Sequence, residues 1–381
     1  MELKKFYTAK NPNTPSKTLA ELAKDESLDI RKAVAGNPNT PPEILTKLTK
    51  SEGWVIRMAV AGNPNTPSES LAELAKDKDV CMLIAGNPNT PSETLAELTK
   101  SEGWGVHMAV ANNPNTPPES LAELAKDESL DIRKAVAGNP NTPPETLAEL
   151  AKDESLDIRK AVAGNPNTPP ETLAELAKDE SLDIRKAVAG NPNTPPETLA
   201  ELTKSEGWGV HMAVANNPNT PPETLAELTK DEDTCMAVAN NLNTPPETLA
   251  ELAKDEIWVI RMAVAGNPNT PPETLAELAK DKDKSVRVDV AGNPNTPPEV
   301  LIKLAKDEEL YVRTKTTENP NYITLIASLS NLLDEDESDV NEDTVLHTHK
   351  EPKELLAEKQ SANRAENESK HNISSVDDYI R

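Results

Sequence analysis

The sequence predicts an all-α protein, a solenoid of about twelve two-helix repeats that are each 24–26 residues long. The motif NPNTP, or a near copy, recurs thirteen times, with ten intervals of 26 residues and two of 24. This segment holds 33 of the 34 prolines. Only 9 of the 381 residues are aromatic, too few for a large compact core. The motif begins at Asn11, Asn37, Asn63, Asn87, Asn113, Asn139, Asn165, Asn191, Asn217, Asn241, Asn267, Asn293 and Asn319.

The first half of each repeat predicts a short helix, as the copy at Asn139 illustrates. Thr142 has a glutamate three residues later, so it predicts a capping box with Thr142 as the N-cap. Pro143 would then be the first helical residue, where its missing N–H costs nothing. The helix should reach about Lys152, with an apolar stripe from Leu147 and Leu150.

The second half predicts another short helix, from about Ser155 to Gly164. Leu156, Ile158, Ala161 and Val162 should form its inner face. Gly or Asn precedes the motif in eleven of the thirteen copies, and these residues tolerate a left-handed helix end. Because the segment is so short, the sequence leaves open whether this helix is α or 3₁₀.

A single repeat is too small to fold alone, so the repeats must stack. Five apolar side chains at roughly 2 kcal/mol each do not offset the ordering of 26 backbones at roughly 1–2 kcal/mol each. We therefore expect an N-terminal half repeat or cap over 1–10, a solenoid over 11–321 and a closing helix over 322–333. Residues 334–381 carry 14 acidic against 6 basic side chains, which predicts a disordered acidic tail.

The repeat NPNTPPETLAELAKD followed by IRKAVA resembles the leucine-rich repeat variant family. The resemblance covers roughly residues 11–320. It implies alternating α and 3₁₀ helices in a right-handed superhelix related to armadillo-like solenoids. The founding type of the family also carries an N-terminal cysteine cluster for an iron–sulfur centre. Residues 1–36 contain no Cys, so the resemblance implies no such centre here.

The net charge of -25 disfavours direct binding to nucleic acid or to anionic membranes. The N-terminus has no apolar stretch typical of a secretory signal, and the sequence has no segment long enough to span a membrane. Two cysteines exclude a disulfide framework and fit a reducing compartment. We expect a cytoplasmic protein, monomeric and without a cofactor.

The repeats differ most just before and within the second helix. Trp replaces Leu at one position in four repeats, either as a larger plug at the edge of the core, the reading we favour, or as an anchor for a partner. Six residues before the motif lies a column of Arg, His or Cys. Arg159, for example, has Asp153, Glu154 and Asp157 close in sequence, so we interpret the column as a ladder of surface ion pairs. The candidate partner-binding residues are Trp54, Trp104, Trp208, Trp258, His107, His211, Arg133, Arg159 and Arg185.

Cys and His in this column raise the possibility of a metal site. Cys81 and His107 fall on adjacent repeats, as do His211 and Cys235. Each pair supplies only two ligands, fewer than a structural zinc site uses, so we predict no metal. A nucleophile needs a base within hydrogen-bond reach, and the two solenoid histidines lie four repeats apart, so we predict no enzyme.

These observations favour a non-catalytic protein-interaction scaffold that binds a partner with a basic surface along an acidic, elongated solenoid. An acidic nucleic-acid mimic, which would inhibit a nucleic-acid-binding protein, is the alternative. A metal- or redox-associated repeat protein is a third, weaker hypothesis.

Overall fold

The computed structural model describes residues 2–336, in which every regular element is helical. The chain divides into two units, unit 1 (1–198) and unit 2 (199–381), and helix α16 (Pro196–Leu202) contains the boundary. The prediction of an all-α solenoid of helix pairs is confirmed. The predicted acidic tail lies outside the described residues, except for 334–336, which belong to α26 (Pro320–Asp336).

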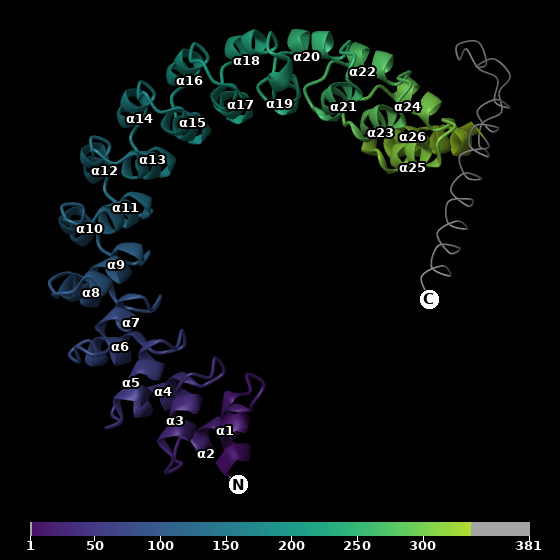
Figure 1. Cartoon of the computed structure of the whole chain (residues 1–381). Coiled ribbons are helices and arrows are strands. Elements are labelled where there is room, and N and C mark those ends of the chain that lie inside the picture. The colour runs from purple at the N-terminus through teal and green to yellow at the C-terminus, as the bar shows by residue number, and fades with distance from the viewer. Residues whose placement is uncertain (1, 337–381) are drawn as a thin grey trace. The chain divides into compact units, whose positions relative to one another are not determined.

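Within each unit the first helices of the repeats form one layer and the second helices form another (Figure 1). In unit 1 the first helices are α2 (Ser16–Leu22), α4 (Pro42–Leu48), α6 (Ser68–Leu74), α8 (Ser92–Thr99), α10 (Pro118–Leu124), α12 (Pro144–Leu150) and α14 (Pro170–Leu176). The second helices are α3 (Leu28–Ala35), α5 (Trp54–Ala61), α7 (Cys81–Ala85), α9 (Trp104–Asn112), α11 (Leu130–Gly138), α13 (Leu156–Gly164) and α15 (Leu182–Gly190). The N-terminal helix α1 (Glu2–Lys10) packs against α3, as second helices of successive repeats do.

Unit 2 repeats the pattern. Its first helices are α18 (Pro222–Leu228), α20 (Pro246–Leu252), α22 (Pro272–Leu278) and α24 (Pro298–Leu304). Its second helices are α17 (Trp208–Asn216), α19 (Cys235–Asn240), α21 (Trp258–Gly266), α23 (Lys284–Gly292) and α25 (Leu310–Glu318). The second helices are thus α-helical, and a single 3₁₀ turn among the described residues, η1 (Glu232–Thr234), precedes α19.

The core is a thin column of aliphatic side chains. Leu147 and Leu150 of α12 and Ile158 and Val162 of α13 are buried, as predicted. Leu156 was expected on the inner face, but it is 42% exposed. It is the first residue of α13, and successive helical residues turn by about 100°, so Leu156 lies roughly opposite Ile158 on the helix.

The caps differ from the prediction. Pro143 is the N-cap of α12, no side chain caps this helix, and Pro144 begins it. The predicted cap, Thr142, donates instead from Oγ1 to the carbonyl of Val136, near the end of the preceding helix α11. The residues before the motif do not take a left-handed conformation either. Among the described residues, positive φ occurs at Gly103 and Gly207, which precede Trp residues.

The first Asn of each motif joins consecutive repeats. Asn165 donates from Nδ2 to the carbonyl of Ala137, near the end of α11, at 2.7 Å and to that of Asn139, the first residue of the preceding motif, at 2.9 Å. Its Oδ1 accepts the backbone N–H of Asn167 at 2.9 Å. Asn165 is 2% exposed, and equivalent bonds recur at the other motifs of each unit. We call these residues the asparagine ladder, because each one donates hydrogen bonds to carbonyl groups of the preceding part of the solenoid.

Candidate functional site

The four tryptophans are exposed, and each is the first residue of a second helix. Their exposed fractions are 55% for Trp54, 58% for Trp104, 58% for Trp208 and 42% for Trp258. The side chain at this position points away from the core, because the next core residue follows two positions later. The Trp side chains therefore do not close the core.

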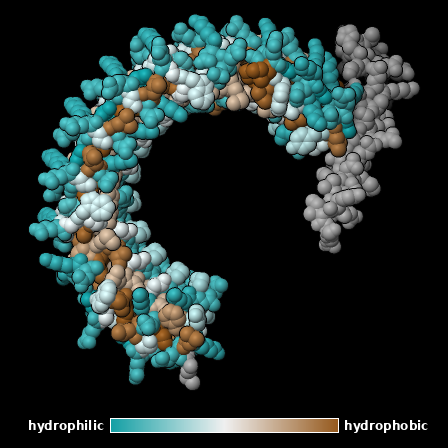
Figure 2. All heavy atoms as spheres, viewed as in Figure 1, coloured by the Kyte–Doolittle hydropathy of each residue, from teal (hydrophilic) through white to brown (hydrophobic). Residues whose placement is uncertain are grey.

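Leucines at the same position are exposed too, so we name this set the exposed apolar row. Figure 2 shows groups of hydrophobic residues among hydrophilic ones on the visible face of unit 1. The row comprises Leu28, Trp54, Trp104, Leu130, Leu156 and Leu182 in unit 1 and Trp208, Trp258 and Leu310 in unit 2.

The arginine column joins repeats through carboxylates. The Nε of Arg159 lies 2.8 Å from the Oδ2 of Asp179, which belongs to the next repeat, and its Nη1 donates to two loop carbonyls of its own repeat. The side chains of this pair are 17% and 11% exposed. The sequence predicted ion pairs, but with acids of the same repeat. The observed partner, Asp179, is 20 residues away in sequence. The stacking of the repeats brings the two side chains together.

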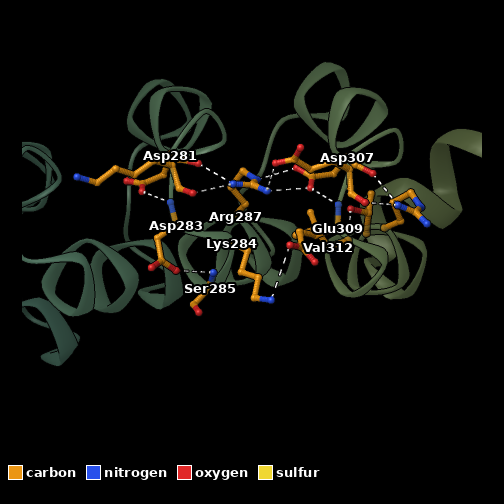
Figure 3. A network of polar contacts seen from close by, with 12 residues as sticks. Asp281, Asp283, Lys284, Ser285, Arg287, Asp307, Glu309 and Val312 are labelled. Atoms are coloured by element: carbon orange, nitrogen blue, oxygen red, sulfur yellow. Dashed lines mark hydrogen bonds and ion pairs between the residues drawn. The ribbon is translucent and has the colours of Figure 1, made fainter. Parts of the chain in front are cut away.

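The same arrangement recurs in unit 2. Arg287 donates to the carbonyl of Asp281 on one side and to the carboxylate of Asp307 on the other, at 2.8 and 2.7 Å (Figure 3). Arg261 donates to the carboxylate of Asp281 from Nε at 2.6 Å and from Nη2 at 2.9 Å. This guanidinium holds the pKa of Asp281 below its ordinary value, and burial opposes the shift. The column therefore acts as a set of inter-repeat clamps.

Histidine replaces arginine in two clamps. The Nδ1 of His107 lies 3.0 Å from Asp127 Oδ2, and its Nε2 lies 2.8 Å from the carbonyl of Ser101. His211 contacts Asp231 and the carbonyl of Ser205 in the same way, at 3.5 and 2.9 Å. Both ring nitrogens of each histidine therefore face acceptors within the chain.

Cysteine occupies the same column in the two 24-residue repeats. Cys81 is 7% exposed and its Sγ donates to the carbonyls of Ala75 and Asp77 at 3.5 and 3.4 Å. Burial raises the pKa of this thiol and that of Cys235. Among the described residues, no cluster of three or more His, Cys, Asp or Glu side chains could hold a metal ion. The thiols take over part of the arginine's bonding to the loop.

Arg133, Arg159 and Arg185 thus differ from the tryptophans in what they offer a partner. Arg133 is clamped to Asp153 at 2.8 Å. Arg185 donates from Nη1 to two loop carbonyls, and its buried Nε has no hydrogen-bond partner. The polar ends of these arginine side chains are engaged in the fold. The Trp side chains are exposed, and the Nε1 of Trp104 donates to the Oγ of Ser129 in the next repeat at 3.1 Å.

Two further columns change together with Trp, which the sequence reading missed. In the repeats of Leu28, Leu130, Leu156 and Leu182 the next residue is Asp and the residue four after Leu is Lys. Lys134 and Asp157, for example, pair across repeats at 3.0 Å. In Trp repeats these positions are Val or Gly and Met. Each Trp therefore accompanies the loss of an exposed charge pair, a signal that aligning the repeats position by position would have found.

The family model for the Leucine Rich Repeat Variant domain matches residues 6–60, 105–152, 131–171, 157–216 and 261–309, which together make up more than half of the chain. The chain belongs to the leucine-rich repeat variant family.

Solved structures resemble this leucine-rich repeat variant protein at low identity. One is described as a leucine-rich repeat variant with a novel repetitive protein structural motif; it is 24% identical, with 64% of this chain and 88% of that chain covered and a TM-score of 0.41. Another, an engineered protein, is 17% identical, with 83% and 93% covered and a TM-score of 0.21. No curated protein matches the chain. None of the described helices is long and apolar enough to cross a membrane.

Proposed function

We propose that this protein is a non-catalytic scaffold that binds a partner protein through the four tryptophans of the exposed apolar row. The observation that carries the proposal is the exposure of all four tryptophans. Exposed Trp dominates the energetics of many protein interfaces. Leu occupies the same position in other repeats, so the fold itself does not require Trp there.

The surrounding charge favours a basic partner. An exposed glutamate stands two residues before each Trp, namely Glu52, Glu102, Glu206 and Glu256. The whole chain carries a net charge of -25. An acidic field speeds the encounter with a cationic surface and disfavours an anionic one. Two buried free cysteines support a reducing compartment such as the cytoplasm.

Replacing all four Trp by Leu tests the proposal. Leu already stands at this position in α3, α11, α13, α15 and α25, so the variant should keep the helical circular dichroism spectrum. We expect wild-type protein to capture a basic partner from a cell extract and the variant to lose it at least tenfold, as quantified by mass spectrometry. The matched control replaces Leu130, Leu156 and Leu182 by Ala and should retain more of the partner than the Trp variant does.

Two outcomes would contradict the scaffold. One is the capture of no specific partner; the other is equal capture by the Trp variant. Adding DNA to the captured complex separates the alternative: release of a partner that then binds the DNA would indicate a nucleic-acid mimic.

A further inference from the structure

The two 24-residue repeats lack two residues of the ordinary repeat, and one of the two is the residue of the exposed apolar row. Asp25-Glu26-Ser27-Leu28-Asp29-Ile30 in an ordinary repeat corresponds to Asp77-Lys78-Asp79-Val80 in the first short one, where Ser and Leu have no counterpart. Helix α7 therefore has 5 residues, whereas α13 has 9. A Trp repeat stands on each side of this short repeat, and α7 contacts both α5 and α9.

In the first short repeat an exposed methionine stands at the helix position that Lys134 has in α11. Met82 of α7 is 54% exposed. Its Sδ lies so near α9 that a Cβ added to Gly105 would be 3.0 Å from it. Gly105 directly follows Trp104, so Met82 packs beside the start of the Trp104 helix. We name the set of Trp54, Met82 and Trp104 Trp–Met site 1.

Unit 2 contains the same combination. Its short repeat reads Asp231-Glu232-Asp233-Thr234, and Met236 of α19 is 47% exposed. Helix α19 contacts α17 and α21, whose first residues are Trp208 and Trp258. We name Trp208, Met236 and Trp258 Trp–Met site 2. All four tryptophans of the chain thus flank a short repeat, two in each unit.

An exposed glutamate stands two residues before each Trp of the two sites. At site 1 these are Glu52 and Glu102, and the exposed Asp79 precedes α7. The lysine found four residues after the row position in ordinary repeats is Met58 and Met108 here. Site 1 therefore offers apolar side chains with carboxylates beside the Trp, and the exposed lysines Lys50, Lys78 and Lys100 lie further back in the same loops.

The spacing suits a short helix. Second helices of neighbouring repeats are about 8–10 Å apart, so two Trp separated by two repeats lie roughly 16–20 Å apart. A helix rises about 1.5 Å per residue, so three or four turns span this distance. Met side chains adapt to the apolar stripe of an amphipathic helix, a recurring mode of recognition.

From this juxtaposition we infer that the chain has two separate docking sites, Trp–Met sites 1 and 2, each of which takes one amphipathic helix with Lys or Arg beside its apolar stripe. The inference rests on the proposed scaffold function and adds the recognised motif and the number of sites.

The test uses the full chain and an 18-residue peptide of Leu and Lys in an amphipathic helical pattern. Calorimetry should give two peptides per chain, and the emission of the four Trp should change on binding. Met82→Lys and Met236→Lys should each reduce the number to one, and the double variant should bind none. Lys is native at this helix position in α11 and α13, as Lys134 and Lys160, so the variants should fold.

Leu156→Lys is the matched control, because it adds the same charge to the row outside both sites, and Lys284 is native there in α23. It should leave two peptides bound. A Leu–Glu peptide of the same pattern should not bind measurably.

A single peptide per chain, no peptide binding, or two peptides on the double variant would each overturn the inference. Equal binding of the Leu–Glu peptide would overturn the basic partner. The scaffold proposal fails separately, when the Trp→Leu variant captures its protein partner as well as wild type does.

Discussion

At the residue scale, one buried asparagine of each repeat joins it to the preceding part of the solenoid by hydrogen bonds. In Asn165→Ala, the carbonyls of Ala137 and Asn139 lose their side-chain donor and the N–H of Asn167 loses its acceptor. We expect a loss of about 2–4 kcal/mol in the free energy of unfolding, measured by urea denaturation. Asn165→Asp keeps the shape and the acceptor but sets carboxylate oxygen against two carbonyls. It should destabilise more than Ala, and an Asp variant as stable as wild type would refute the ladder.

The clamp between Arg261 and Asp281 predicts a dependence on pH. Hydrogen bonding lowers the pKa of Asp281 in the folded chain, so its contribution to stability is complete above the unfolded value of about 3.9 and disappears as the pH falls through the lowered value. Asp281→Asn should cost about 1–3 kcal/mol at pH 7 and less at pH 3, by urea denaturation at both values. Asp157→Asn, in an exposed pair, should have little effect at either pH. A pH-independent cost for Asp281→Asn would contradict the clamp.

At the scale of the elements, proline and leucine spacing predicted both helices of the repeat to within two residues. The prediction placed α12 at Pro143–Lys152, and it spans Pro144–Leu150. The predicted cap was wrong because a Thr hydroxyl can bond either the following or the preceding helix, and Thr142 bonds the carbonyl of Val136 in the preceding one. The partner of Arg159 could not be read either, since Asp153, Glu154 and Asp157 are near in sequence whereas Asp179 is near in space.

The exposure of the Trp side chains could not be predicted from the sequence either. Trp replaces Leu, and a leucine in a short amphipathic helix is normally an inner residue. Leu156 is exposed in the same way as the Trp, because it starts its helix two residues before the first buried one. The reading of Trp as a plug for the core fails for the same reason.

The short repeats provide a test at this scale. Inserting Ser-Leu between Lys78 and Asp79 restores the ordinary loop sequence, so α7 should lengthen from 5 residues toward the 9 of α13. The amides of Cys81–Ala85 should then exchange more slowly with deuterium, because a longer helix frays less at its ends. The same insertion between Glu232 and Asp233 is the control in unit 2 and should slow exchange in α19 alone. Unchanged exchange in α7 would show that the short loop does not limit this helix.

At the scale of the whole molecule, charge opposes the folded state. The chain carries -25, and most repeats present two glutamates on the first helix, such as Glu145 and Glu149. Neighbouring helices are about 8–10 Å apart, and the screening length is about 30 Å at 0.01 M salt and 10 Å at 0.1 M. Glutamates of successive repeats therefore repel one another at low salt, whereas the half-buried clamps are screened much less.

Salt should consequently stabilise this protein. We expect the melting temperature to rise by a few degrees between about 0.01 and 0.3 M NaCl, followed by circular dichroism. The matched variant is Glu149→Lys with Glu175→Lys, because Lys47 and Lys303 occupy the same position of α4 and α24. This variant should melt higher than wild type at low salt and respond less to added NaCl. A melting temperature that falls with salt would mean that the inter-repeat ion pairs, and not the repulsion between exposed glutamates, dominate the electrostatics of the solenoid.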